Sequence, residues 1–403
     1  MKDWFLILRW SWRDLRKYWV KVIAIALVIG IGTGAYAGLT STANWRRDSN
    51  VASMELLNMY DVRFELATDS SVPVGELAAA ASGIEHAGWI EGTVERLIRP
   101  TQVDASTGTE TVLVPGEIVG VDVTNGGPAI NGWYTATGDG LTVADAGQPV
   151  VLLEEGFAFH NDLAKSGMIT VSGGVELEYK NTAMTPESFI VVPENTTSFA
   201  QGTYAGVFTS LETAQRLTGF DGGVNDLILT VGAEADRDVV ATEVKNAISD
   251  LGVGVNTILR EDDPSYRLLF EDVENDQEFF NIFALLIFVG AVMGAFNLIT
   301  RLSEAQRREI GIAMALGVAP RKIALRPLLV GAQIALLGVV FGVGVGLLIG
   351  NLMRSVVDRF LILPVWLTDF HWCLFFGVAV VGFVVPVAAA AYPVWGAVRV
   401  KPI

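Results

Sequence analysis

The sequence predicts a membrane protein with four transmembrane α-helices and a large extracytoplasmic α+β domain. Of its 403 residues, 51% are hydrophobic, more than in an ordinary soluble protein. Four uncharged apolar segments are each long enough to cross a bilayer as a helix. These predicted spans are residues 22–44, 279–300, 327–353 and 372–395. Charge is distributed unevenly along the chain. Residues 44–278 hold 12 lysines and arginines against 38 aspartates and glutamates, whereas the remainder of the chain holds 16 against 6.

The sidedness follows from the basic loop 301–326 between the second and third spans. Six of its residues are lysine or arginine, and short basic loops stay on the cytoplasmic side. Four spans then place the N-terminal segment 1–21 and the tail 396–403 in the cytoplasm. The acidic segment 45–278 and the short loop 354–371 lie outside. An acidic domain with few basic residues argues against nucleic acid as a partner.

The first 21 residues alternate basic with aromatic side chains, as in a helix that lies at a lipid interface before a span. Two spans carry glycine at every fourth position, which gives a smooth face for close helix packing. We expect these faces to form helix–helix seams, including one between two copies of the chain. The glycines are Gly30, Gly34 and Gly38 in the first span and Gly338, Gly342, Gly346 and Gly350 in the third. Ala35-Tyr36-Ala37 also resembles a signal-peptidase site, but the glycine face favours a retained helix.

Two strand–helix–strand patterns predict the core of the extracytoplasmic domain. They comprise 61–66, 75–82 and 89–99, and then 226–231, 236–250 and 253–259. Between them, about residues 100–222, short apolar runs alternate with Gly, Asn, Asp and Pro, which predicts a β-rich insertion. Its predicted strands are 112–121, 150–153, 168–171, 189–192 and 206–209, and its one predicted helix is 211–217. The pattern therefore predicts a split βαβ module with a separate β-rich lobe.

Two helical stalks are expected to connect this domain to the membrane. Residues 45–60 continue the helical pattern of the first span. Asp263 and Pro264 suit the cap and first turn of a second helix, which runs into the second span through five carboxylates between 271 and 278. Such a run can bind a divalent cation but is more typical of a solvated stalk.

The loop 301–326 predicts a short amphipathic helix at the cytoplasmic surface. Ser303 and Gln306 have the spacing of a capping box, Gly317 suits the C-terminal cap, and Pro320 suits the first turn of the next helix. The phrase REIGIAMALGVAPRKI in this loop resembles the cytoplasmic coupling segment of the MacB/FtsX-like permeases of ABC transporters (type VII). The sequence departs from that family's usual pattern at Ala305-Gln306, where Glu-Arg is common.

The resemblance covers the loop specifically and the rest of the chain by topology. It implies that the loop contacts a cytoplasmic ABC ATPase through nine residues, namely Arg307, Arg308, Glu309, Ile310, Gly311, Met314, Gly317, Pro320 and Lys322. It also implies a bacterial plasma membrane location, a porter-like βαβ module interrupted by a β-rich lobe, and a second permease copy or permease half. ATP and magnesium would be bound by the partner ATPase, and this chain would need no cofactor of its own.

Two functions remain open at this point. The chain couples ATP hydrolysis to export or extraction of a lipid, lipoprotein, peptide or drug, or it activates an extracellular partner such as a cell-wall hydrolase without transport. The size of the outer domain favours the first. The chain ends where the family's tail usually continues, so it is expected to be either a whole permease or the front half of a longer one.

No catalytic pattern argues for an enzyme. The sequence has no Gly-Lys pair and hence no Walker A loop, no His-Glu-x-x-His motif, and no Gly-x-Ser-x-Gly motif. His86, His160 and His371 lack ligand spacing, and Cys373 is the only cysteine, so no metal site is expected.

Overall fold

The computed structural model describes residues 9, 11–13, 15–107, 110–192, 200–305, 308, 312, 316 and 320–398. The chain forms two compact units. The helical unit comprises Met1–Arg46, Val273–Arg359 and Leu367–Ile403, and the sheet unit comprises Arg47–Asp272 and Phe360–Trp366. We describe each unit by itself.

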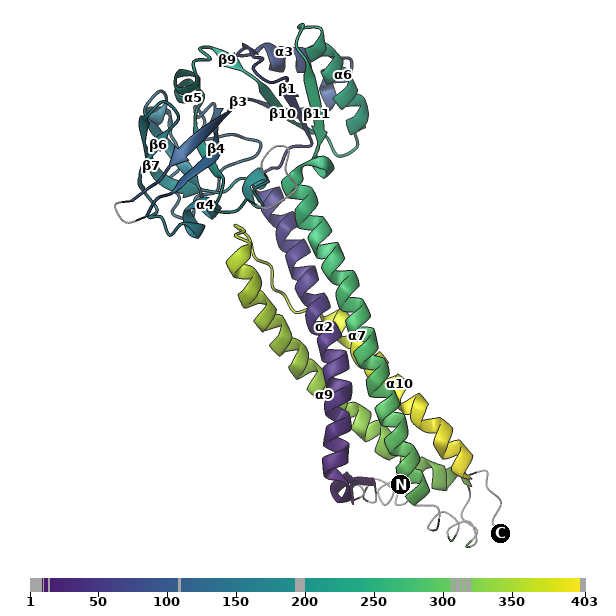
Figure 1. The fold of residues 1–403 in the computed structure, drawn as a ribbon. Helices are drawn as coiled ribbons and strands as arrows, with labels where there is room; N and C mark the ends of the chain where they lie inside the picture. Colours follow the sequence, from purple (N-terminus) through teal and green to yellow (C-terminus); the bar gives the residue numbers. More distant parts are fainter. Residues whose placement is uncertain are drawn as a thin grey trace. The chain divides into compact units, whose positions relative to one another are not determined.

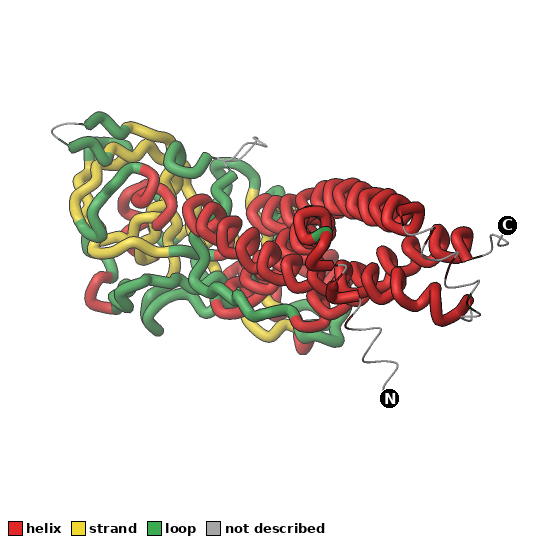
Figure 2. The backbone as a smooth tube through the Cα atoms, turned by 90° about the horizontal axis from the view of Figure 1, so that it is seen from below, coloured by secondary structure: helices red, strands yellow, loops and turns green. Residues whose placement is uncertain are grey.

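Four long helices make up most of the helical unit (Figures 1 and 2). They are α2 (Trp19–Leu56), α7 (Pro264–Ala305), α9 (Pro320–Phe360) and α10 (Trp372–Val398). Each contains a window apolar and long enough to span a membrane. The window in α2 is 56% buried and that in α7 only 6%, so α2 is the central helix and α7 has the most exposed apolar surface. Leu15, just before α2, packs with Val22 and Val330, which anchors the N-terminal segment on α9.

The first part of the sheet unit is a pair of interlocked split βαβ motifs. In chain order they are β1 (Val62–Leu66), α3 (Glu76–Ser82) and β3 (Ile90–Asp104), then β10 (Asp226–Val231), α6 (Arg237–Ser249) and β11 (Val255–Leu259). The strand order is β11-β1-β10-β3, so each motif has one strand of the other between its own two. Helices α3 and α6 pack together on one side of these strands (Figure 1).

The second part continues the same sheet beyond β3. Its further elements are β4 (Leu113–Val121), β5 (Val150–Glu154), α4 (Glu155–His160), β6 (Gly167–Val171), β7 (Val175–Ala183), β8 (Ala205–Ser210) and α5 (Leu211–Thr218). The order β3-β4-β8-β5-β7-β6 closes where β6 pairs with the end of β3. Among the described residues this part is a small closed barrel, and its first strand is also the last strand of the βαβ sheet. A two-stranded pair, β2 (Val72–Pro73) with β9 (Gly223–Val224), and four short 3₁₀ turns complete the unit.

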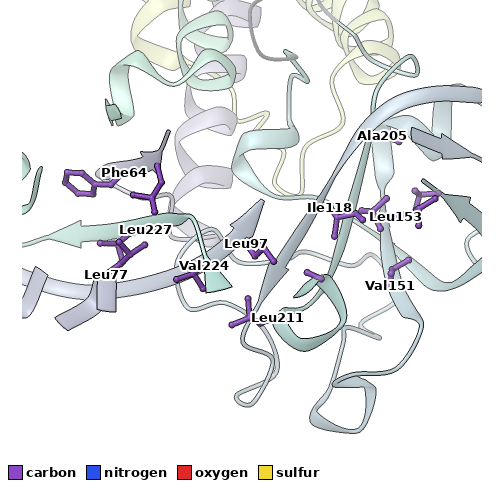
Figure 3. Close-up of a cluster of buried hydrophobic side chains, with 14 of the residues drawn as sticks. Phe64, Leu77, Leu97, Ile118, Val151, Leu153, Ala205, Leu211, Val224 and Leu227 are labelled. Atoms are coloured by element: carbon purple, nitrogen blue, oxygen red, sulfur yellow. The ribbon is translucent and has the colours of Figure 1, made fainter. Parts of the chain in front are cut away.

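Alternation along the strands separates two faces. In β1, Val62, Phe64 and Leu66 are buried in the main core, while Arg63 and Glu65 point to the other face. That core runs under both parts of the sheet and includes Leu97, Ile118 and Leu153 (Figure 3). A second cluster, which includes Val119, Val121 and Phe208, fills the opposite side of β4 and β8.

The predicted fold class is confirmed: four apolar helices accompany a large sheet-rich domain. Two sequence expectations about its details were wrong. Phe189–Val192 is not a strand but irregular chain, directly after the 3₁₀ turn Pro186–Ser188. The β-rich part is not a separate sheet either, since the 15-residue strand β3 belongs to both parts.

Candidate functional site

The loop between α7 and α9 carries the sequence-predicted coupling residues. Of the nine, Arg307, Glu309, Ile310, Gly311, Met314 and Gly317 lie outside the described residues. Arg308 is exposed, and Pro320 and Lys322 lie in the first turn of α9, which begins at Pro320.

Two apolar residues of this loop were not predicted to contribute to its surface. The side chains of Ile312 and Leu316 are 54% and 78% exposed. The amide of Leu316 donates to the carbonyl of Ile312 at 3.0 Å, so the two belong to one helical turn. Large apolar side chains exposed together on one turn are typical of a protein-docking surface. Their spacing of four, visible in the sequence, could have found them.

The two glycine stripes lie against each other within one chain. A Cβ atom placed on Gly34 would lie 2.6 Å from the carbonyl oxygen of Gly342, and one on Gly38 would lie 2.6 Å from that of Gly346. Helix α2 therefore approaches α9 backbone to backbone. The other three glycines continue this seam: Gly30 lies beside Phe341, Gly338 beside Ile29, and Gly350 beside the Trp45 ring. Gly346 also lies beside Phe375 of α10.

Polar contacts join the helices at the end of the helical unit nearest Arg46. Nη1 of Arg46 lies 2.6 Å from Oδ2 of Asp276, which ties α2 to α7. The indole of Trp45 donates to the carbonyl of Asp369 at 2.7 Å, which ties α2 to the segment before α10. These contacts hold α2 at a fixed place in the bundle.

Within the sheet unit, a second set of contacts ties the segment after α2 to the segment that leads into α7. The hydroxyl of Tyr60 donates to Oδ2 of Asp263 at 2.7 Å, and Arg260 pairs with Asp61 at 2.8 Å. Asp263 also caps α7, since its Oδ1 accepts from the amide of Tyr266 at 3.0 Å. Burial, followed by the nearby Glu187 charge, raises the pKa of Asp263. Burial, followed by the Asp263 charge, raises the pKa of Tyr60. We call this group the helix clamp.

A buried ion cluster lies beside the helix clamp, on the sheet face opposite α3 and α6. Asp226 of β10 accepts from Nε of Arg63 at 2.6 Å and from Nε of Arg96 at 2.7 Å. Glu187 accepts from Nη1 of Arg96 at 2.6 Å and from Nδ2 of Asn131 at 2.8 Å. The cluster thus connects the βαβ strands with the connections that cover the barrel.

Two arginines and two carboxylates neutralise one another in this cluster. Burial alone would raise the pKa of Glu187, but the charges of Arg96 and Arg63 outweigh it and lower the pKa to about 2. Burial disfavours the Arg96 charge, and the carboxylates of Asp226 and Glu187 more than compensate, so the pKa of Arg96 rises. Glu187 and both arginines are therefore charged at neutral pH.

His86 has partners that the sequence did not indicate. Its Nδ1 lies 2.7 Å from Oε1 of Glu243, and its amide donates to Oε2 of the same carboxylate at 3.1 Å. With Glu85 these side chains form a group compact enough to hold a metal ion. Glu243 comes from α6, 157 residues further along the chain, so no local spacing could reveal it.

Four helices long and apolar enough to span a membrane, in a chain that also has a large sheet domain, define a multi-pass membrane protein. Residues 281–402 match the family model described as "FtsX-like permease C-terminal". This part of the chain is an FtsX-like permease domain. That family consists of transporter permeases, for which a cytoplasmic ATPase partner is general.

Two solved structures are similar to part of the chain. One is the periplasmic region of MacB from Actinobacillus actinomycetemcomitans, at 9% identity and a TM-score of 0.35, covering 53% of this chain and 92% of that one. The other is the extracellular domain of the noncanonic ABC-type transporter YknZ from Gram-positive bacteria, at 9% identity and a TM-score of 0.33, covering 48% and 98%. A comparison with curated protein sequences finds no match.

Proposed function

We propose that this chain couples ATP hydrolysis by a cytoplasmic ATPase to motion of its sheet unit, for export or extraction of a lipid, lipoprotein, peptide or drug. The observation that carries the proposal is the continuity of two helices. Helix α2 passes unbroken from its apolar span to Leu56, and α7 runs unbroken from Pro264 into its own span. Both helices thus belong to the membrane part and to the sheet part of the chain.

The contacts at the two levels give the proposal its mechanism. In the helical unit the Arg46–Asp276 pair joins α2 to α7. In the sheet unit the helix clamp joins the segment that follows α2 to the segment that leads into α7. In this proposal, a displacement at the cytoplasmic end of α7 is passed along the helix to the sheet unit. ATP then shifts the population between two arrangements of the spans and the sheet unit.

The ATPase is expected to contact the loop 301–326. The nine residues Arg307, Arg308, Glu309, Ile310, Gly311, Met314, Gly317, Pro320 and Lys322 are proposed as its contacts. Ile312 and Leu316 add an exposed apolar pair to the same surface. In this arrangement the loop and both termini are cytoplasmic, residues 45–278 are extracytoplasmic, and two permease copies or halves form one complex.

Isolation of the tagged chain from its native membrane tests this function. An ATPase with Walker motifs is expected to co-purify with the wild-type chain and with Glu304→Lys, a charge reversal in the same loop outside the family-like phrase. Its recovery is expected to fall at least tenfold with Glu309→Lys or Gly311→Trp. If a secreted hydrolase also co-purifies, the chain activates a partner rather than moving a substrate. If no ATPase appears with any nucleotide, the proposal is wrong.

A further inference from the structure

The large sheet of the sheet unit has an open edge at β11. At one end the sheet closes on itself, because β6 pairs back to the end of β3. At the other end β11 pairs with β1 on its inner side, and no strand of the described residues pairs with its outer side. An open strand edge is a template to which another extended chain can pair.

Two hydrogen bonds show which residues of this edge face β1. The amide of Arg260 donates to the carbonyl of Asp61 at 3.0 Å, and the amide of Ala67 donates to the carbonyl of Gly254 at 2.8 Å. In an antiparallel pair, the residues that bond to the partner strand alternate with residues that do not. The even-numbered residues from 254 to 260 therefore bond to β1, and the odd-numbered residues direct their main-chain groups outward.

The outward residues of β11 are Val255, Thr257 and Leu259. Among their main-chain groups, the carbonyl of Leu259 accepts from the amide of Asp263 at 3.1 Å. The three N–H groups and the carbonyls of Val255 and Thr257 have no hydrogen-bond partner in the part of the chain that the structure describes. Donors and acceptors that alternate in this way match another extended main chain.

Strand β11 lacks the devices that usually protect a sheet edge. Its sequence, VNTIL, contains no charged residue and no proline, and its register with β1 runs through without a bulge. Gly254 and Asn256 are exposed, and the other four residues of the strand are half-buried, so solvent reaches it. The edge is therefore open to an added strand.

The side chain of Thr257 supports this reading of the edge. Its Oγ1 is buried and has no hydrogen-bond partner among the described residues. Buried hydroxyl groups without a partner are uncommon in folded proteins. On an added strand, the residue opposite Thr257 lies close enough for a Ser or Thr side chain to bond to this hydroxyl.

The charge around the edge indicates which strands it accepts. Asp250 before the strand and Asp262 after it are exposed carboxylates. The two arginines near the end of the strand already pair with carboxylates, as Arg237 does with Glu261 at 2.8 Å. Residues 44–278 as a whole hold 12 lysines and arginines against 38 aspartates and glutamates. A basic strand is therefore favoured over an acidic one.

We propose that the edge of β11 is a docking site for an extended, basic segment of a second protein, which pairs with β11 as an added strand. The free main-chain groups of β11 bond to the segment, and a Ser or Thr of the segment bonds to the Thr257 hydroxyl. Basic residues at the two ends of the segment lie near Asp250 and Asp262. Docking does not depend on the ATPase partner, because every residue involved belongs to the sheet unit.

Binding of a dye-labelled peptide to the full chain in phosphatidylcholine nanodiscs tests the proposal. The probe is Lys-Thr-Val-Thr-Val-Thr-Lys with blocked ends, fluorescence anisotropy gives its bound fraction, and empty nanodiscs give the background. We expect saturable binding. One matched probe has Glu in place of both Lys, and the other is N-methylated at its three central residues, which removes main-chain donors. Both are expected to bind about tenfold more weakly.

Variants of the chain locate the binding on β11. Thr257→Pro removes an N–H that points away from β1, so it blocks the edge without breaking the existing ladder. Asn256→Lys places a positive charge on the exposed side of the strand. Each is expected to lower the affinity for the basic peptide about tenfold. Asn125→Lys, the same charge change in an exposed turn, is expected to leave the affinity unchanged.

Four results would overturn the proposal. The basic peptide shows no saturable binding beyond that of empty nanodiscs, or the N-methylated peptide binds as tightly, or the acidic peptide does. The fourth is a wild-type dimer that Thr257→Pro separates, which would mean that a second copy of the chain occupies the edge. Circular dichroism checks the folding of each variant, and Asn256→Lys keeps the test decisive if Thr257→Pro does not fold.

Discussion

Nε of Arg96 lies 2.7 Å from Oδ1 of Asp226, and the two side chains are only 3% and 1% exposed. They lie opposite each other in the paired strands β3 and β10, which belong to different βαβ motifs. Glu187 adds a third charge from the segment that covers the barrel. The ion cluster is thus the point at which the two motifs and the barrel meet.

Removal of one member of this cluster is expected to destabilise the sheet unit strongly. Glu187→Gln leaves the Arg96 charge buried with one carboxylate fewer, and breaking such a pair costs about 3–5 kcal/mol. Hydrogen exchange in β3 and β10 of the intact chain measures the loss. Glu178→Gln on exposed β7 is the matched control. Equal exchange in both variants would mean that the cluster contributes nothing to stability.

The stability of the sheet unit is expected to depend on pH in two opposite ways. The pKa of Glu187 is lowered from 4.5 to about 2, so its contribution is present above pH 4.5 and is lost as the pH falls towards 2. The pKa of Glu154 is raised from 4.5 to about 7, so the folded state holds a proton that the unfolded state releases. Its stabilising effect is present below pH 4.5 and is lost as the pH rises to 7.

Stability is therefore expected to be highest near pH 5 and lower at both pH 3 and pH 8. Each shift corresponds to about 3 kcal/mol. Denaturant unfolding of the sheet unit in the intact chain, followed across this range, measures the profile. Glu154→Gln is expected to flatten the fall between pH 5 and pH 8 and to leave the acid side unchanged. The same slope in the variant and the wild type would contradict this assignment.

The glycine seam predicts a position-specific effect in the spans. Gly34→Leu is expected to separate α2 from α9, because even a Cβ atom at this position would lie 2.6 Å from the carbonyl oxygen of Gly342. Gly344→Leu on α9 is the matched control, since a Cβ atom there meets nothing within 4 Å. Thermal stability of the purified chain and cysteine cross-linking between the two helices measure the difference. If both variants behave alike, close packing at the seam is not needed.

The cap of α7 predicts a local change. Asp263→Ala removes both the acceptor of the Tyr60 hydroxyl and the N-terminal cap of the helix. Loss of such a cap costs about 1 kcal/mol, and loss of the buried hydrogen bond adds a similar amount. Faster hydrogen exchange is expected in the first turn of α7. Asp262→Ala, an exposed neighbour, is the control and should exchange as the wild type does.

Much of the fold could be predicted from the sequence, because local rules decide those elements. Strand β10 has the predicted ends, and Asp263 caps α7 as expected. The long uncharged apolar segments predicted the four helices that could span a membrane. Each of these depends on a short stretch of chain in which apolar periodicity and capping residues agree.

The rest depends on contacts between distant residues. Strand β7 was not predicted, although Glu176, Glu178 and Lys180 alternate with apolar residues as in a half-buried strand. Its register comes from β5 and β6. The ion cluster combines residues from β1, β3, β10 and the turn at Glu187. Their separation of up to 163 residues hides the site from any motif. The sequence shows both glycine stripes, but only the structure shows that the stripe of α2 packs against the stripe of α9 within one chain.

The central claim is that ATP hydrolysis moves the sheet unit relative to the spans through the loop 301–326. Fluorescent labels at Glu178→Cys in the sheet unit and Trp372→Cys in the helical unit, with Cys373→Ser, report this motion by energy transfer. With the partner ATPase in nanodiscs, ATP is expected to shift the transfer in this labelled chain and in its Glu304→Lys form. Glu309→Lys or Gly311→Trp is expected to abolish the shift while leaving the sheet unit folded. An undiminished ATP-driven shift in both variants would contradict the account.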